Sequence, residues 1–259
     1  MTPATKTRLA AKQSVSGFTL LELMVATFLF VVITGVVFAV LIAAQARYKT
    51  EKEFMGAFQQ ANVAIDQITH DIHGAGFPSK SLYNYSVQGN PSQSASYAVP
   101  VAWSPNYPAT PCVIGSSCTS PGAFDLILEE DLGNGLGVQW IRYKLQGTVL
   151  YRGVAPKVAG SDPVSSTDPV LVPYLENVMN NASAAQIAQI SAAFPGTFPG
   201  GNPVDVFKFP LYQGQPQQPP NIHNVNISLV VQAANVDLQT QGPRIAIITG
   251  QASTVNPYQ

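Results

Sequence analysis

The sequence contains little charge. Only 10% of its 259 residues are Asp, Glu, Lys or Arg, and the net charge is −1. No lysine and arginine cluster of the kind that follows a phosphate backbone is present, so nucleic acid is not expected as a partner. The chain has two cysteines, and two cysteines alone make a poor zinc site.

The short motifs of common catalytic centres are also missing. The chain has no Gly-x-Ser-x-Gly elbow, no P-loop and no His-Glu-x-x-His motif. Three histidines occur. His223 stands in a predicted loop or strand edge, and His70 and His73 lie one turn apart near a helix end, where they favour the helix dipole and have no obvious third metal ligand. We therefore expect no enzyme, no cofactor and no metal site.

Proline is absent between residues 18 and 77, although the chain has 21 prolines. The first part of this stretch, Phe18 to Ala44, reads FTLLELMVATFLFVVITGVVFAVLIAA and carries a single charge, that of Glu22. As a helix with a rise of about 1.5 Å per residue it would be about 40 Å long, enough to cross a bilayer core of about 30 Å. The sequence predicts a membrane helix without a proline kink.

A short basic segment precedes this helix. Lys6, Arg8 and Lys12 lie before Gly17 with no acid among them, so removal of residues 1–17 would change the net charge from −1 to −4. The positive-inside rule then predicts a cytoplasmic N-terminus and an exported remainder. A secretory signal peptide fits less well, because the apolar run is long and no small-x-small site closes it. An ordinary signal anchor with a chance acid stays open.

Glu22 needs an explanation, since a carboxylate at membrane depth is costly and usually has a partner. No cation occurs between Thr19 and Ala46. The partner is therefore expected on another molecule or at a new chain terminus. Cleavage between Gly17 and Phe18 would create an α-amine, with Glu22 as the fifth residue of the new chain. The amine of a neighbouring copy, displaced by about one helical turn, could then lie beside the carboxylate.

The stretch GFTLLELMVA after a basic leader resembles the class III signal of type IV pilins and type II secretion pseudopilins. Gly17, Phe18 and Glu22 match the family pattern residue by residue. The resemblance implies cleavage after Gly17 and N-methylation of Phe18 by a prepilin peptidase. It also implies that Glu22 guides assembly into a filament. Many major pilins carry a kinking proline in this helix, and this chain does not.

After Gln45 the helix pattern becomes amphipathic. Apolar residues recur at steps of four and three and predict a stripe that packs on the sheet of the same domain: Phe54, Phe58, Ala61, Ile65, Ile68 and Ile72. The polar residues between them are expected to face water: Glu53, Gln59, Asn62, Asp66, Gln67 and Asp71. The sequence HGAGFP at 73–78 predicts the end of the helix.

Beyond residue 77 the chain is rich in Pro, Gly, Ser, Asn and Gln, which favours a loop-rich β domain. Alternating patterns predict about six strands, the first three as an antiparallel meander: 123–130, 137–145, 148–153, 204–209, 223–233 and 244–253. Segment 77–123 is expected to be an irregular surface region. Segment 154–203 is expected to be loop-rich, with a short helix at 183–194 and a short helix or strand at 171–181.

These patterns predict an α+β, pilin-like fold in which a long helix packs on an antiparallel sheet domain with long loops. The expected units are a cleaved leader at 1–17, a membrane and assembly helix at 18–46, its amphipathic continuation at 47–76 and an exported β-rich domain at 77–259.

The two cysteines and one acidic segment of the expected exported domain each have two possible interpretations. Cys112 and Cys118 are expected to form a disulfide, since an exported domain becomes oxidised, with free thiols as the alternative. The acidic EEDLGNG at 129–135 offers oxygen ligands for calcium, but its spacing does not fit an EF-hand. A solvated acidic turn is expected there.

HDIHGAGF at 70–77 and YKLQGTVLYRG at 143–153 are similar, more loosely, to PilW-type minor pilins and J-type minor pseudopilins. The resemblance implies a minor pilin in type IV pilus assembly, adhesion or motility; the alternative is a minor pseudopilin of type II secretion. A membrane-anchored binding module or enzyme is a distant alternative. Implied partners are major and minor pilin subunits, the prepilin peptidase and the inner-membrane assembly platform. The implied location is the bacterial inner membrane, then a periplasmic or extracellular filament.

Overall fold

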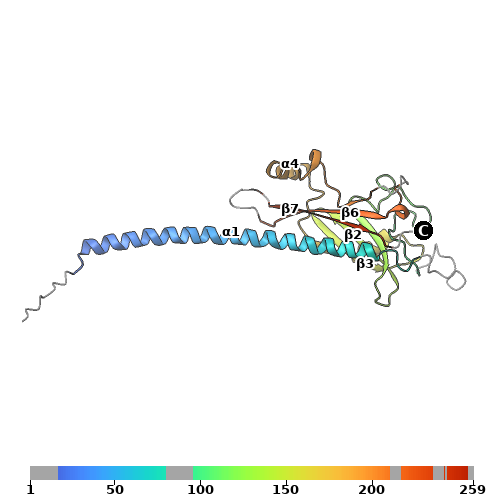
Figure 1. The fold of residues 1–259 in the computed structure, drawn as a ribbon, viewed down its shortest axis with the longest axis horizontal. Coiled ribbons are helices and arrows are strands. Elements are labelled where there is room, and N and C mark those ends of the chain that lie inside the picture. Colours follow the sequence, from blue (N-terminus) through green and yellow to red (C-terminus); the bar gives the residue numbers. More distant parts are fainter. Residues whose placement is uncertain (1–16, 80–95, 211–216, 236–241, 243, 256–259) are drawn as a thin grey trace, which may run out of the picture. The chain divides into compact units, whose positions relative to one another are not determined.

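The computed structural model describes residues 17–79, 96–210, 217–235, 242 and 244–255. Lys6, Arg8 and Lys12 of the basic leader lie outside the described residues. The chain divides into two compact units, Met1–Tyr48 and Lys49–Gln259. Helix α1, Leu20–Gly74, begins in the first unit and ends in the second, and antiparallel strands follow it (Figure 1). The predicted α+β fold class, a long N-terminal helix followed by a β-sheet region, is confirmed.

In the first unit, α1 is long and apolar enough to cross a membrane. Its large apolar side chains from Leu20 to Ile42 are all exposed. Because no proline interrupts residues 18 to 77, every peptide of this stretch keeps its N–H for the helix ladder.

In the second unit, the larger sheet has four strands in the order β1-β2-β3-β4, all antiparallel. They are β1 (Asp125–Asp131), β2 (Val138–Gln146), β3 (Val149–Pro156) and β4 (Val172–Leu175). The turn between β2 and β3 holds Gly147 at a φ of 60°, which suits glycine in a two-residue hairpin loop. The predicted meander is confirmed, and segment 171–181 supplies its fourth strand.

The smaller sheet has the order β5-β6-β7 and is also antiparallel. Its strands are β5 (Phe207–Lys208), β6 (Asn224–Gln232) and β7 (Ile245–Ser253). About six strands were expected, and the structure describes seven, divided between two sheets. Most of the predicted strand 204–209 is irregular, because the chain from Asn177 to Asn180 takes over the pairing with the second half of β6.

The C-terminal half of α1 packs on both sheets and forms the main core (Figure 1). Ala61, Ile65, Ile68 and Ile72 of the predicted stripe are buried, together with Ala64. Phe54 of this stripe is half-buried against the same core, whereas Phe58 is 38% exposed. Gly250 of β7 meets the helix closely, since a Cβ there would lie 2.6 Å from Ile65 Cγ2.

A second cluster forms where an irregular surface was expected. Tyr97, Val99, Ala102, Trp103 and Tyr107 are buried against Ile127 and Trp140 of the larger sheet. The surface prediction is wrong for this part of segment 77–123. The reason is physical: the aromatic side chains have apolar surface to bury, and they find an apolar sheet face that local sequence does not reveal.

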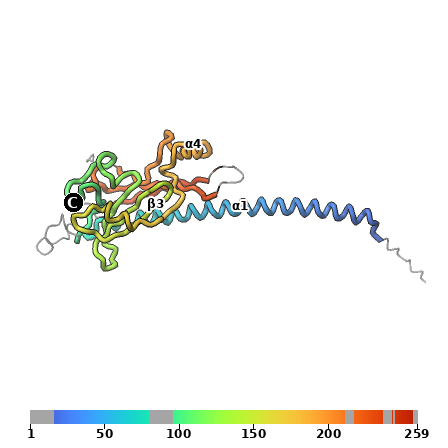
Figure 2. Tube along the Cα trace, turned by 180° about the vertical axis from the view of Figure 1, so that it is seen from behind, coloured from blue at the N-terminus to red at the C-terminus, as the bar shows by residue number. Residues whose placement is uncertain are grey.

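The connection between β3 and β5 carries two α-helices. They are α3 (Pro163–Thr167), followed by a 3-10 turn at Asp168–Val170, and α4 (Ala184–Ala193). Ser183 and Gln186 form a capping box at the start of α4, as the predicted helix at 183–194 requires. Further 3-10 turns occur at Pro199–Gly201 and Pro219–Asn221. Within the second unit, α4 stands apart from the end of α1 (Figure 2).

Candidate processing and assembly site

The bond between Gly17 and Phe18 lies in non-helical backbone just before α1. Both residues are exposed, Phe18 to 86%, and nothing lies within 4 Å of a Cβ built at Gly17. A peptidase must bind its substrate as accessible, non-helical backbone, and this bond satisfies both conditions. The candidate cleavage and methylation residues are therefore placed together, at the entry of the apolar helix.

Glu22 forms a reciprocal hydrogen-bonded pair with Thr19. Its Oε2 accepts from the Thr19 backbone N–H at 2.9 Å and from the Thr19 hydroxyl at 3.0 Å. The Glu22 backbone N–H donates to Thr19 Oγ1 at 3.2 Å. With Thr19 at the N-cap and Glu22 at the third helical position, this is a capping box.

Thr19 is thus a hydrogen-bond partner of Glu22 within the chain, in addition to the cation expected from another molecule or a new chain terminus. Such a partner is not a cation, because a carboxylate at a helix start can also bind the N–H groups that the helix leaves open. The spacing Thr-x-x-Glu before an apolar run is the sequence signal that would have revealed it. Thr19 supplies neutral donors and no positive charge, so an α-amine would still be a stronger partner for the carboxylate.

Apolar side chains surround Glu22 in the sequence. Between residues 18 and 46 it is the only ionisable side chain, and the large apolar residues of this stretch are exposed. Such a surface is far larger than the apolar patches of ordinary soluble monomers. A bilayer core or other apolar helices would remove such a surface from water.

The second unit contains a different kind of polar site, in which Asp71 joins the helix to the larger sheet. Asp71 is 1% exposed, so its predicted place on the wet face is wrong. Its Oδ2 accepts from the Tyr143 hydroxyl at 2.6 Å and from Arg152 Nη2 at 2.9 Å, and its Oδ1 accepts from Gln67 Nε2 at 2.6 Å. Burial is possible because the carboxylate has an ion pair and hydrogen bonds on both oxygens.

Glu130 lies beside this group. It is 9% exposed, and Oε2 has no hydrogen-bond partner among the described residues. Its carboxyl fills the space that a Cβ on Gly74 would occupy at the end of α1. Burial, and then the negative charge of Asp71, raise the pKa of Glu130 to about 7.

Glu129, the neighbour of Glu130, faces the second cluster and is fully buried. Its carboxylate accepts from Lys157 Nζ at 2.7 Å, Trp140 Nε1 at 2.8 Å, the backbone N–H of Val99 at 2.9 Å and the Tyr107 hydroxyl. The prediction of a solvated acidic turn is therefore wrong for Glu129 and Glu130. The observed contacts hold the 97–107 segment against β1 and β2.

Arg142 forms a third buried ion pair. Its guanidinium forms a bidentate pair with Asp125, in which Nε donates to Oδ1 at 3.0 Å and Nη2 donates to Oδ2 at 2.6 Å. It also donates to Asp168. The contacts tie β2 to β1 and to the turn after α3. Arg142 thus binds carboxylates of its own chain, as expected for an ion pair that stabilises the fold.

The remaining candidates are in the second unit. Cys112 and Cys118 form the predicted disulfide, which closes the loop between them. His70 and His73 are both exposed near the end of α1, and His70 lies 3.7 Å from Asp71. Across the described ranges, no three His, Cys, Asp or Glu residues come together in a group that could hold a metal ion.

No protein-family model, curated protein or solved structure matches this chain, so its function is argued from the site itself.

Proposed function

We propose that the chain is a minor pilin of the PilW type, a structural subunit that enters or starts a type IV pilus. One observation carries the proposal. A single carboxylate, Glu22, sits in the first turn of a long, exposed apolar helix, and the accessible Gly17–Phe18 bond lies directly before it. A pilin needs a cleavable bond, an apolar helix and a carboxylate in the first turn of that helix, at this spacing.

The energetics explain why such a helix would pass from membrane to filament. Each fully buried large apolar side chain contributes about 1.5–3 kcal/mol relative to water, so the segment is stable only in lipid or against other helices. In lipid, the hydrogen bonds from Thr19 satisfy one oxygen of Glu22. In a filament, the α-amine of Phe18 from a neighbouring copy would add a charge-assisted bond that Thr19 does not provide.

The second unit fits an exported location. Its disulfide, Cys112–Cys118, is of the kind that persists outside the reducing cytosol. Together with the basic leader, which favours a cytoplasmic N-terminus, it supports a single-pass subunit whose domain lies in the periplasm before assembly.

The test of processing is the intact mass and N-terminal sequence of the protein from membranes and from sheared surface filaments. A chain that begins with N-methylated Phe18 in the filament fraction supports the proposal. A chain that still begins near Met1, or one released as a soluble domain by a cut elsewhere, contradicts it. Recovery with a secretion pseudopilus instead of a pilus would assign the subunit to the pseudopilin branch.

The test of assembly is Glu22→Val, with Thr27→Val as its matched control. Both changes remove a polar group from the same exposed helix, but Thr27 binds only the carbonyls of Leu23 and Met24 one turn back. Glu22→Val should leave cleavage after Gly17 intact and remove the protein from sheared filaments. Thr27→Val should leave both steps unchanged. Normal recovery of Glu22→Val in filaments would refute the role of the carboxylate.

A further inference from the structure

The smaller sheet carries a hollow on its outer face. The hollow has a volume of about 840 Å³, within the range of small-molecule sites. Its floor is formed by side chains of β5, β6 and β7, and one wall by the chain from Gly196 to Asp205. We call it the outer-sheet hollow, and its floor residues are Lys208, Asn226, Ser228, Thr249 and Gln251.

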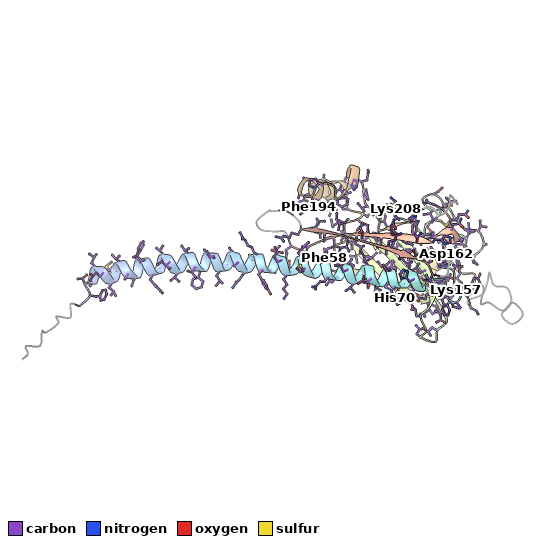
Figure 3. The ribbon with its side chains drawn as sticks, in the orientation of Figure 1. Phe58, His70, Lys157, Asp162, Phe194 and Lys208 are labelled. Atoms are coloured by element: carbon purple, nitrogen blue, oxygen red, sulfur yellow. A yellow bond between two sulfur atoms is a disulfide. The ribbon has the colours of Figure 1, made fainter. Side chains whose placement is uncertain are left out.

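The register of the strands places this floor on the face away from α1. Ile227 of β6 pairs with Gly250 of β7, and Gly250 faces Ile65 of the helix. Residues on either side of this pair point the opposite way, because side chains alternate along a strand. Lys208 pairs with Asn226, and Asn226 with Gln251, so the three side chains form one row across the sheet. In Figure 3, Lys208 lies on the other side of the domain from Phe58 and His70 of α1.

The wall makes this polar face more than an ordinary solvated sheet. Pro199 and Pro203 stiffen the segment beside the floor, and Phe198 anchors it in an apolar cluster with Val230. The hollow therefore has a largely preformed shape.

The floor also contains an acceptor without a donor. Oδ1 of Asn226 is buried and has no hydrogen-bond partner among the described residues. Leaving a buried acceptor unpaired costs about 1–3 kcal/mol, so such a group ordinarily has a donor from water or a ligand. Because this oxygen is shielded from solvent, the Asn226 amide must turn about its last side-chain bond to bring the oxygen into the hollow, where a ligand hydroxyl would donate to it.

The chemistry of the lining excludes several ligand classes. Lys208 and Asp205 carry opposite charges, which gives no net preference for anions or cations. No aromatic side chain of the described residues lines the hollow, so the described lining offers nucleobases no ring to stack on. An extended peptide that adds to a sheet pairs with the backbone of an edge strand, here β7, and not with the side-chain floor of the hollow.

What remains are neutral amide and hydroxyl groups, each able to donate and to accept: Asn226, Ser228, Thr249 and Gln251. A sugar hydroxyl also does both. The prolines and the half-exposed Ile247 offer apolar surface for the C–H faces of a sugar ring. We propose that the outer-sheet hollow binds a neutral oligosaccharide. This proposal does not depend on the pilin assignment.

The test uses the full chain in lipid nanodiscs and saturation-transfer NMR with chitotriose, cellotriose and maltotriose. A heparin-derived oligosaccharide and an unstructured hexapeptide serve as contrasts. At least one neutral trisaccharide should bind at millimolar concentration or below. Asn226→Ala should weaken that binding about tenfold, since one satisfied hydrogen bond is lost and an acceptor removed.

Two further variants keep the test decisive. Gln251→Ala changes an exposed floor side chain, so it should fold normally and also weaken binding. Gln232→Ala is the matched control, because Gln232 lies on the same face of β6 but outside the hollow. The proposal is overturned if no neutral trisaccharide binds, if only the acidic oligosaccharide or the peptide binds, or if Gln251→Ala and Gln232→Ala have equal effects.

Discussion

Glu130 is expected to make the folded domain less stable as the pH rises from 5 to 8. Burial raises its pKa first, and the charges of Asp71 and Asp131 raise it further, while His70 and Arg152 act in the opposite direction. The Tyr143 hydroxyl on β2 donates a hydrogen bond to Asp71, the carboxylate beside Glu130. The result is a carboxyl that stays protonated in the folded state until a pH of about 7.

The sign and size of the effect follow from proton linkage. The carboxyl has an ordinary pKa of 4.5 in the unfolded chain and about 7 in the folded one. Between these values the unfolded state holds fewer protons, so the free energy of unfolding falls as the pH rises and levels off above 7. The full difference corresponds to about 3 kcal/mol. This value is an upper bound, and we expect about 1–2 kcal/mol.

The assay is thermal unfolding of the full chain in detergent micelles at pH values from 5 to 8. Wild-type Tm should fall over this range by about 2–8 °C, at about 2–4 °C per kcal/mol for a domain of this size. Glu130→Gln should remove most of the decline and raise Tm at pH 8. Glu176→Gln, at an exposed carboxylate just after β4, should keep the wild-type profile. An unchanged decline in Glu130→Gln would refute the reasoning.

Three further predictions concern stability and can be measured by urea unfolding. Lys157→Met should cost about 3–5 kcal/mol, because the fully buried carboxylate of Glu129 loses its counter-charge; addition of Glu129→Gln should recover part of the loss, and a strictly additive double variant would contradict this account. Gly250→Val should cost about 1–3 kcal/mol through overlap with Ile65, with partial rescue by Ile65→Ala; no loss in Gly250→Val would show that the helix can move away. Cys118→Ser should cost about 2–3 kcal/mol, the chain-entropy value for a short loop, with an equal loss in wild type under reducing conditions.

Several elements could be predicted because their signal is local. The run from Phe18 to Ala44 is apolar around the whole helix, and no tertiary contact is needed to recognise it. The strands β1, β2, β3, β6 and β7 follow period-two patterns and glycine turns, and they form within one to three residues of the predicted bounds. With two cysteines in the chain, the pairing had a single internal solution.

The buried charges could not be predicted in this way. Asp71 and Arg152 are 81 residues apart in the sequence, and Glu129 and Lys157 are 28 apart. In a pattern analysis each of these acids counts as a solvated residue, because an unpaired charge rarely enters a core. Only the fold brings the partner close enough to offset the cost of desolvation.

The sequence by itself therefore determined the long apolar helix, the Gly17–Phe18–Glu22 spacing, the meander and the disulfide, since each depends on neighbours along the chain. Tertiary structure decided the division into two sheets, the burial of the 97–107 segment, the ion pairs of Asp71 and Glu129, and the outer-sheet hollow. These features depend on which strands pair and which faces pack. Residues far apart in the sequence become neighbours only when the chain folds.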